Sequence, residues 1–178
     1  MSDYCYVVVM QNNTMSPQSE NHATLHLLCG KIASGKSTLA ATLAQTPGTV
    51  VLSEDNWLAA LFKESMHSVE DYVHYAAKLR SAIQPHTVSL LRAGVNVVLD
   101  FPANTPASRQ WMMSVVNESG AQHRLHYLEV SDEVCKARLH QRNAQGEHDF
   151  AATEAQFDFI TRYFVAPAEE EGFTLLRY

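Results

Sequence analysis

A run of eight residues from Gly30 to Ser37 has the residue types and spacing of a phosphate-binding loop. Its sequence, GKIASGKS, matches the pattern GxxxxGK[ST] and lies between an apolar run and a segment with helical periodicity. Glycines allow such a loop to turn its backbone N–H groups inward, and the N-terminus of the following helix adds positive potential. The pattern therefore predicts a site for the phosphates of a nucleotide.

The residue types in this loop predict two kinds of contact. Lys36 would reach the β- and γ-phosphates, and the Ser37 hydroxyl would coordinate Mg²⁺. A tight turn with a solvated lysine is the alternative, but a chance match to this pattern in the chain is only about 1%. The expected nucleotide contacts are Gly30, Lys31, Ile32, Ala33, Ser34, Gly35, Lys36, Ser37 and Thr38.

Asp100 supplies the carboxylate that a magnesium-dependent phosphate loop needs. It ends the hydrophobic run of residues 95–99, which predicts a strand that stops at this aspartate. Together with Ser37 it is the expected metal site, and the carboxylate would act mainly through water. The alternative is that Asp100 only caps the strand end or the following turn.

The surroundings of these motifs favour phosphoryl transfer over hydrolysis. Phe101 follows Asp100, where motor-type ATPases commonly keep a glutamate that polarises the attacking water. The sequence also has no NKxD-type guanine-binding stretch.

Short apolar runs alternate with helical patterns from residue 25 onward. The expected strands are residues 25–29, 50–53, 95–100, 125–130 and 173–178. This alternation predicts an α/β fold, a three-layer α/β/α sandwich whose five-stranded parallel sheet is covered by right-handed crossovers. Ligands of such sheets bind beyond the carboxyl ends of the strands, where the motifs above lie.

Helix-terminal signals support this interpretation. Residues 68–71 (SVED) predict a capping box that opens a long helix, which Pro85 should kink and Gly94 should close. Residues 105–106 (TP) predict an N-cap followed by proline, and Gly120 should end that helix.

Beyond the second expected strand, SEDNW places Glu54 and Asp55 side by side. With this motif the chain resembles the small P-loop kinases and phosphotransferases. The resemblance rests on four motifs in this order: GKIASGKST, SEDNW, VVLDF followed by Asn104 and Arg109, and KARLHQRN. This group includes gluconate kinase, chloramphenicol phosphotransferase, the zeta-toxin type of kinase and the 5′-kinase of bacteriophage polynucleotide kinase. The resemblance covers about residues 24–178. The glycine loop is very specific, whereas the other motifs are specific only as an ordered set.

The resemblance implies a P-loop NTPase fold of the nucleotide-kinase type with a helical lid at about residues 138–152. In this group an aspartate shortly after the second strand commonly lies against the acceptor hydroxyl, and Asp55 matches that position. Such a carboxylate can orient the hydroxyl and accept its proton. The alternative is that Asp55 only caps the helix that begins at Asn56.

Arg138 and Arg142 resemble the lid arginines that neutralise the transferred phosphate in these kinases. They are four residues apart, so they share one helical face. The alternative is an exposed helical face that pairs with Asp132 or Glu133.

Weaker expectations concern the acceptor. Asn104 and Arg109 could contact it, although a turn residue and a surface salt bridge are the alternatives. Glu54 is expected to be a solvated neighbour of Asp55, and His148 to face solvent. Four aromatic residues are expected to pack in the core rather than to form an acceptor wall: Trp57, Phe62, Tyr72 and Tyr75.

The composition fits one folded domain in a reducing compartment. The chain has 178 residues, 46% of them hydrophobic, and a formal charge of −6, which disfavours long nucleic acids as partners. Three cysteines without a CxxC pattern (Cys5, Cys29 and Cys135) suit the cytoplasm and predict neither zinc nor disulfides. Cys29 and Cys135 are expected to be small buried hydrophobes.

Residues 1–22 are expected to form a flexible tail before a single kinase domain of residues 23–178. Their apolar run CYVVVM is too short for a secretory signal or a membrane span, and an added edge strand is the alternative.

These features predict a cytoplasmic kinase that uses ATP and Mg²⁺ and acts on a hydroxyl of a small molecule. One alternative is a 5′-hydroxyl polynucleotide kinase. A second is a nucleotide-dependent binding or switch module without an acceptor. The pattern names neither the acceptor nor the oligomeric state.

Overall fold

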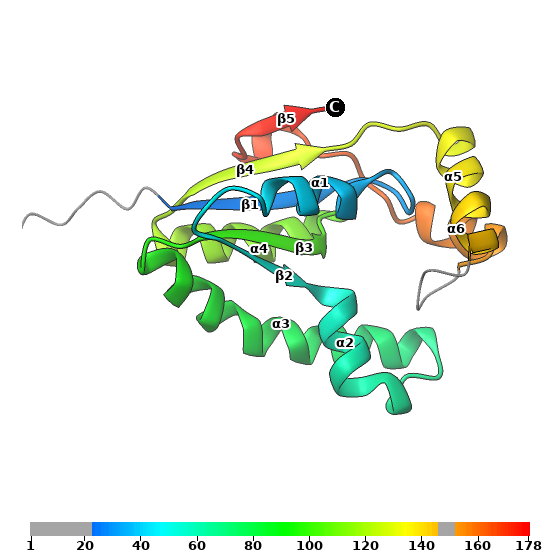
Figure 1. Ribbon diagram of the computed structural model, residues 1–178, viewed down its shortest axis with the longest axis horizontal. Coiled ribbons are helices and arrows are strands. Elements are labelled where there is room, and N and C mark those ends of the chain that lie inside the picture. Colours follow the sequence, from blue (N-terminus) through cyan, green and yellow to red (C-terminus); the bar gives the residue numbers. More distant parts are fainter. Residues whose placement is uncertain (1–22, 146–151) are drawn as a thin grey trace, which may run out of the picture.

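A five-stranded parallel sheet forms the centre of the molecule (Figure 1). The computed structural model describes residues 23–145 and 152–178. The expected tail of residues 1–22 and the predicted lid residues 146–151, with His148, lie outside the described residues, so the tail and the domain boundary stay predictions.

All neighbouring strands pair in parallel in the order β2-β3-β1-β4-β5. This confirms the predicted α/β fold. The strands are β1 (Thr24–Cys29), β2 (Thr49–Ser53), β3 (Asn96–Pro102), β4 (Gln122–Tyr127) and β5 (Leu175–Arg177).

Parts of the two central strands β1 and β3 are apolar on both faces because helices cover both sides of the sheet. Residues 27–29 of β1 and 97–99 of β3 are fully buried, as expected for a doubly covered parallel sheet. On one face, α1 (Lys36–Leu43) packs Ala40 against Leu28 and Val98. On the other face, α3 (Val69–Arg92) and α4 (Pro106–Ser119) cover the larger core.

The remaining helices lie toward the end of the sheet to which the strands point (Figure 1). They are α2 (Glu54–Phe62), α5 (Asp132–Gln145) and α6 (Glu154–Thr161), with the short 3₁₀ turn η1 (Lys63–Ser65) after α2. A second 3₁₀ turn, η2 (Glu169–Glu171), precedes β5. None of the described helices combines the length and apolar character that crossing a membrane requires.

The predicted helix ends are confirmed. Ser68 and Asp71 form a reciprocal capping box at the start of α3. Thr105 caps α4 in front of Pro106, and Gly120 follows α4 with a left-handed backbone. Each of these signals is local, so neighbouring residues alone suffice to produce it.

Two stacked histidines lie on neighbouring central strands. His26 Nδ1 and His126 Nε2 are 3.0 Å apart, and His126 Nδ1 is 2.8 Å from the Tyr178 hydroxyl. Burial lowers the pKa of both rings, to about 4 for His126, and the positive charge of Arg124 lowers both further. The folded protein therefore favours the neutral form of this pair.

Acid should destabilise the fold through His126. The pKa of His126 is depressed from 6.5 to about 4 in the folded state. Its contribution to the free energy of unfolding is therefore fully present above pH 6.5 and is lost as the pH falls toward about 4. The unfolded chain takes up the proton first. In urea unfolding at several pH values, His126→Asn should reduce the slope of the unfolding free energy against pH by up to about 1.4 kcal/mol per pH unit. His86, exposed on α3, is the matched control, and equal slopes for wild type and His126→Asn would contradict this account.

Candidate functional site

The glycine loop lies between the end of β1 and the start of α1, where its motif glycines meet two different requirements. Gly35 precedes α1 with φ 106°, in the left-handed region that favours glycine. At Gly30 the constraint is space, because a Cβ there would lie 2.5 Å from Ser34 Oγ and 3.2 Å from the Leu128 carbonyl oxygen. The backbone of the loop is therefore closely packed against the segment after β4.

Lys36 begins α1 and folds back across the loop. Its ammonium donates hydrogen bonds to the carbonyl oxygens of Gly30 at 2.6 Å and of Lys31 at 2.8 Å. Burial lowers the pKa of Lys36, whereas the nearby carboxylates of Asp100 and Asp55 act in the opposite direction. The lysine is thus a cation in a desolvated site, where an anion would be bound strongly.

Three side chains between the two glycines are partly or fully buried. Ile32 and Ala33 contact the cluster of Cys135, Leu139 and Phe157 on α5 and α6, and Ser34 is also buried. Their expected nucleotide contacts would therefore come from the backbone.

Lys31, another expected nucleotide contact, has partners of its own. Its ammonium forms an ion pair with Asp132 at the start of α5 and lies 5.9 Å from the centre of the Phe164 ring. Ser37 and Thr38, in contrast, expose their side chains in the first turn of α1, where the Ser37 hydroxyl can reach a ligand.

Asp100 lies at an irregularity of the sheet beside the loop. Leu27 of β1 pairs with Leu99, but the next residue, Leu28, pairs with Pro102, so Asp100 and Phe101 are extra residues on β3. Bulges of this kind commonly redirect side chains next to active sites. Burial raises the pKa of Asp100, the Lys36 ammonium lowers it, and Asp55 raises it again. Asp100, Lys36 and Asp55 therefore share one electrostatic environment.

The available oxygen donors fit a magnesium ion that is shared with phosphates. Nowhere in the described part of the chain do three His, Cys, Asp or Glu side chains gather as metal ligands. Mg²⁺ in phosphoryl-transfer sites commonly takes one or two protein oxygens and completes its shell with phosphates and water. The Ser37 hydroxyl and the Asp100 carboxylate are donors of that type.

Asp55 lies in the first turn of α2, directly after β2, and its side chain is exposed. Ser53 occupies the N-cap position, so Asp55 is not the capping residue that the alternative required. Its charge acts on Lys36, Asp100 and Arg142. The carboxylate thus belongs to the charged group beside the loop and remains accessible to a small molecule.

The expectation for Glu54 was wrong. Its side chain is 1% exposed and accepts hydrogen bonds from the Tyr72 hydroxyl at 2.9 Å and from Arg80 at 3.0 and 3.2 Å. Burial raises the pKa of Glu54, and Arg80 and Tyr72 counteract this. Glu54 therefore links α2 to α3 through hydrogen bonds and does not face solvent.

The two predicted lid arginines differ in their partners. Arg138 donates to the Ser34 carbonyl oxygen at 3.1 Å and so contacts the loop. Arg142 has a buried Nε without a hydrogen-bond partner among the described residues. Burial lowers the pKa of Arg142, and Asp55 raises it. An unpaired buried donor on a guanidinium is costly unless an anion occupies the site.

Arg109 forms an ion pair, the alternative to an acceptor contact, but its side chain is buried and not at the surface as that alternative expected. It is fully buried and donates to both carboxylate oxygens of Glu171, at 2.5 and 2.8 Å, and to the carbonyl oxygens of Ala103 and Val165. Asn104 is engaged as well, since its Oδ1 accepts the Gly30 N–H at 2.9 Å. Glu171 lies in a run of three glutamates, so no local signal singles it out as the partner.

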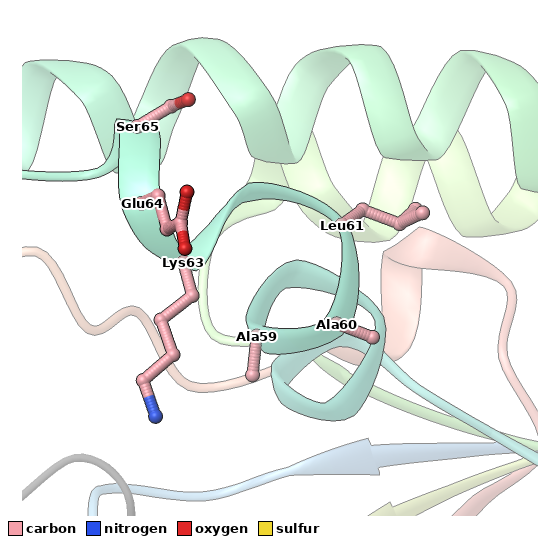
Figure 2. Close-up of a pocket in the computed structure, with 6 residues that line it drawn as sticks. All are labelled: Ala59, Ala60, Leu61, Lys63, Glu64 and Ser65. Carbon is pink, nitrogen blue, oxygen red and sulfur yellow. The ribbon is translucent and has the colours of Figure 1, made fainter.

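A surface hollow of ≈ 390 Å³ lies apart from these residues. It is formed by the second half of α2 and by η1, and Figure 2 shows Ala59 and Lys63 pointing to the same side of it. Its lining contains no residue of the predicted site: Ala59, Ala60, Leu61, Lys63, Glu64 and Ser65.

Comparison with known proteins identifies the family. The family model described as AAA domain matches residues 25–167. The chain belongs to the AAA domain family. The search of curated proteins found no match.

Solved structures share the fold of this AAA domain. A kinase candidate from Chloroflexus aurantiacus has a TM-score of 0.70 at 20% identity, with 89% of this chain and 85% of that chain covered. The APS kinase of Mycobacterium tuberculosis, solved with AMPPNP and APS, has a TM-score of 0.59 at 19% identity, with 88% of each chain covered. A sugar kinase from Janibacter sp. HTCC2649 has a TM-score of 0.57 at 16% identity, covering 88% of this chain and 85% of that one. At these identities the likeness establishes the P-loop kinase fold, as predicted.

The ion pair between Arg109 and Glu171 should be a major contribution to stability. Glu171→Ala would leave a buried guanidinium without its counter-charge and should lower the unfolding free energy by about 3 kcal/mol in urea titrations. Glu170→Ala, at the exposed neighbouring position, should change it by less than about 0.5 kcal/mol. Similar losses in the two variants would show that the pair does not stabilise the fold.

Proposed function

We propose that this AAA domain is a kinase that transfers the γ-phosphate of Mg·ATP to a hydroxyl group of a small molecule. The observation that carries the proposal is the group of four charged side chains beside the glycine loop: Lys36, Asp55, Asp100 and Arg142. Two cations and two carboxylates whose charges act on one another suit a phosphoryl group between a nucleotide and an acceptor. Three of them lie at or just beyond the ends of parallel strands, and Arg142 comes from the last turn of α5.

The glycine loop would hold the triphosphate. Its backbone N–H groups and the N-terminus of α1 would face the phosphates, and Lys36 would exchange its two carbonyl partners for the β- and γ-phosphate oxygens. Ser37 and Asp100 would hold Mg²⁺, which neutralises phosphate charge when it is bound.

Asp55 would orient the acceptor hydroxyl and take its proton as the new bond to phosphorus forms. Its exposed position at the start of α2 leaves it open to a small molecule from solvent. Positioning the hydroxyl in line with the γ-phosphate is the main contribution a protein makes to this reaction.

Arg142 would bind the equatorial oxygens of the transferred phosphoryl group. Its unpartnered Nε offers a charge-assisted hydrogen bond to the negative charge on those oxygens. Arg138, which bonds to the Ser34 carbonyl oxygen, would hold the loop beneath the phosphates.

The charges around the site favour a small acceptor over a nucleic-acid end. The chain has a formal charge of −6. Arg80 and Arg109, which precede and follow β3 in the sequence, are both paired with glutamates. A 5′-hydroxyl polynucleotide kinase needs a cationic channel for the strand. Cys29 and Cys135 are free and buried, which fits a cytoplasmic location.

Asp55→Asn tests the proposal. Wild type incubated with Mg·ATP and pooled hydroxyl metabolites should produce a compound that gains the mass of a phosphate. Asp55→Asn should slow this transfer by about 10²–10⁴-fold, because the amide cannot accept the proton. Its affinity for Mg·ATP, measured by calorimetry, should stay close to that of wild type.

The matched control is Asp158→Asn, which removes only an exposed ion pair with Lys136 and should transfer phosphate at the wild-type rate. Unchanged turnover in Asp55→Asn would remove Asp55 from the proposed role. Tight nucleotide binding without transfer to any acceptor would favour the switch module.

A further inference from the structure

Asn104 lies one residue beyond the last contact between β3 and β1, next to the start of the glycine loop. The two extra residues on β3 bring the chain back to β1, where Leu28 pairs with Pro102 and its carbonyl oxygen accepts the Ala103 N–H at 3.0 Å. The next residue is Asn104, whose Oδ1 accepts the Gly30 N–H at 2.9 Å. The bulge that positions Asp100 therefore also brings an amide side chain to the first residue of the loop.

The backbone of Asn104 is held from the opposite side by the segment after α6. Its carbonyl oxygen accepts the Val165 N–H at 2.9 Å. The Val165 carbonyl oxygen in turn accepts from Arg109 Nη1 at 2.8 Å. A continuous series of hydrogen bonds thus runs from the buried guanidinium through Val165 and Asn104 to Gly30.

The same segment also contacts the loop through a side chain. Phe164 lies against the Lys31 ammonium at 5.9 Å and stacks with Tyr127 at a centroid distance of 6.2 Å. Glu171 fixes the other end, since its carboxylate binds Arg109 and accepts the Ala168 N–H at 2.9 Å. The start of the loop is therefore supported by residues that are far from it in sequence.

We infer that Asn104 is a positioning residue for nucleotide binding, and that Arg109 holds Asn104 in place through the segment after α6. The inference rests on the proposed nucleotide site. A phosphate loop binds through backbone N–H groups that must already point inward, and a loop that is ordered only on binding loses affinity to the entropy of ordering. Asn104 would supply this order through the hydrogen bond from the Gly30 N–H to its side-chain oxygen.

Calorimetric titration of Mg·ATP into Asn104→Ala tests the inference. Loss of the hydrogen bond to Gly30 should raise the dissociation constant by about tenfold. The control is Gln84→Ala, which removes hydrogen bonds to Trp111 and Glu118 between α3 and α4. It should lower the melting temperature at least as much as Asn104→Ala and leave the dissociation constant unchanged.

A second variant tests the role of Arg109 while keeping one of its hydrogen-bond acceptors at position 171. Glu171→Gln keeps one acceptor for Arg109 and should raise the dissociation constant by a smaller factor, about threefold. An unchanged constant in this variant would overturn the role given to Arg109.

The remaining outcomes separate the inference from the proposed function. If wild type binds Mg·ATP and Asn104→Ala binds it equally well, the positioning role is wrong and the proposed function stands. If wild type binds no Mg·ATP, the proposed function fails and the inference fails with it.

Discussion

The binding of the Lys36 ammonium by two carbonyl oxygens of its own loop, within the field of the Asp100 carboxylate, is the interaction on which the rest of the site depends. A cation in a desolvated position is unfavourable unless negative groups surround it. The parallel sheet meets this requirement through its strand order, because β3, which carries Asp100, pairs directly with β1, which leads into the loop. The fold thus brings residues that are distant in sequence to one edge.

The charged side chains of the site do not fully compensate one another, which suits a charged ligand. Burial disfavours the ionised forms of Lys36, Asp100 and Arg142. The carboxylates of Asp100 and Asp55 favour the charged form of Lys36, Lys36 favours that of Asp100, and Asp55 favours that of Arg142. Asp55 and Asp100, however, repel each other. A nucleotide triphosphate with its metal would supply anionic oxygens to the two cations and a divalent charge to the two carboxylates. Ligand and protein would then complete each other's charge pairing.

The features that follow from neighbouring residues could be predicted from the sequence. The glycine loop, the apolar strands and the caps at Ser68 and Thr105 each depend on residues a few positions apart. The ion pairs could not be predicted, because Arg109 pairs with a residue 62 positions away and Arg80 with one 26 positions away. Their partners are decided by tertiary packing, which is why the sequence predicts the burial of neither Arg109 nor Glu54.

Calorimetric titration of Mg·ATP into wild type, Lys36→Ala and Lys63→Ala tests the central claim most directly. Wild type and Lys63→Ala, whose lysine lines the separate hollow on η1, should bind the nucleotide with equal affinity. Lys36→Ala should show no measurable binding, while its melting temperature shows that it remains folded. Nucleotide binding that is unaffected by Lys36→Ala, or no binding by wild type, would contradict the account.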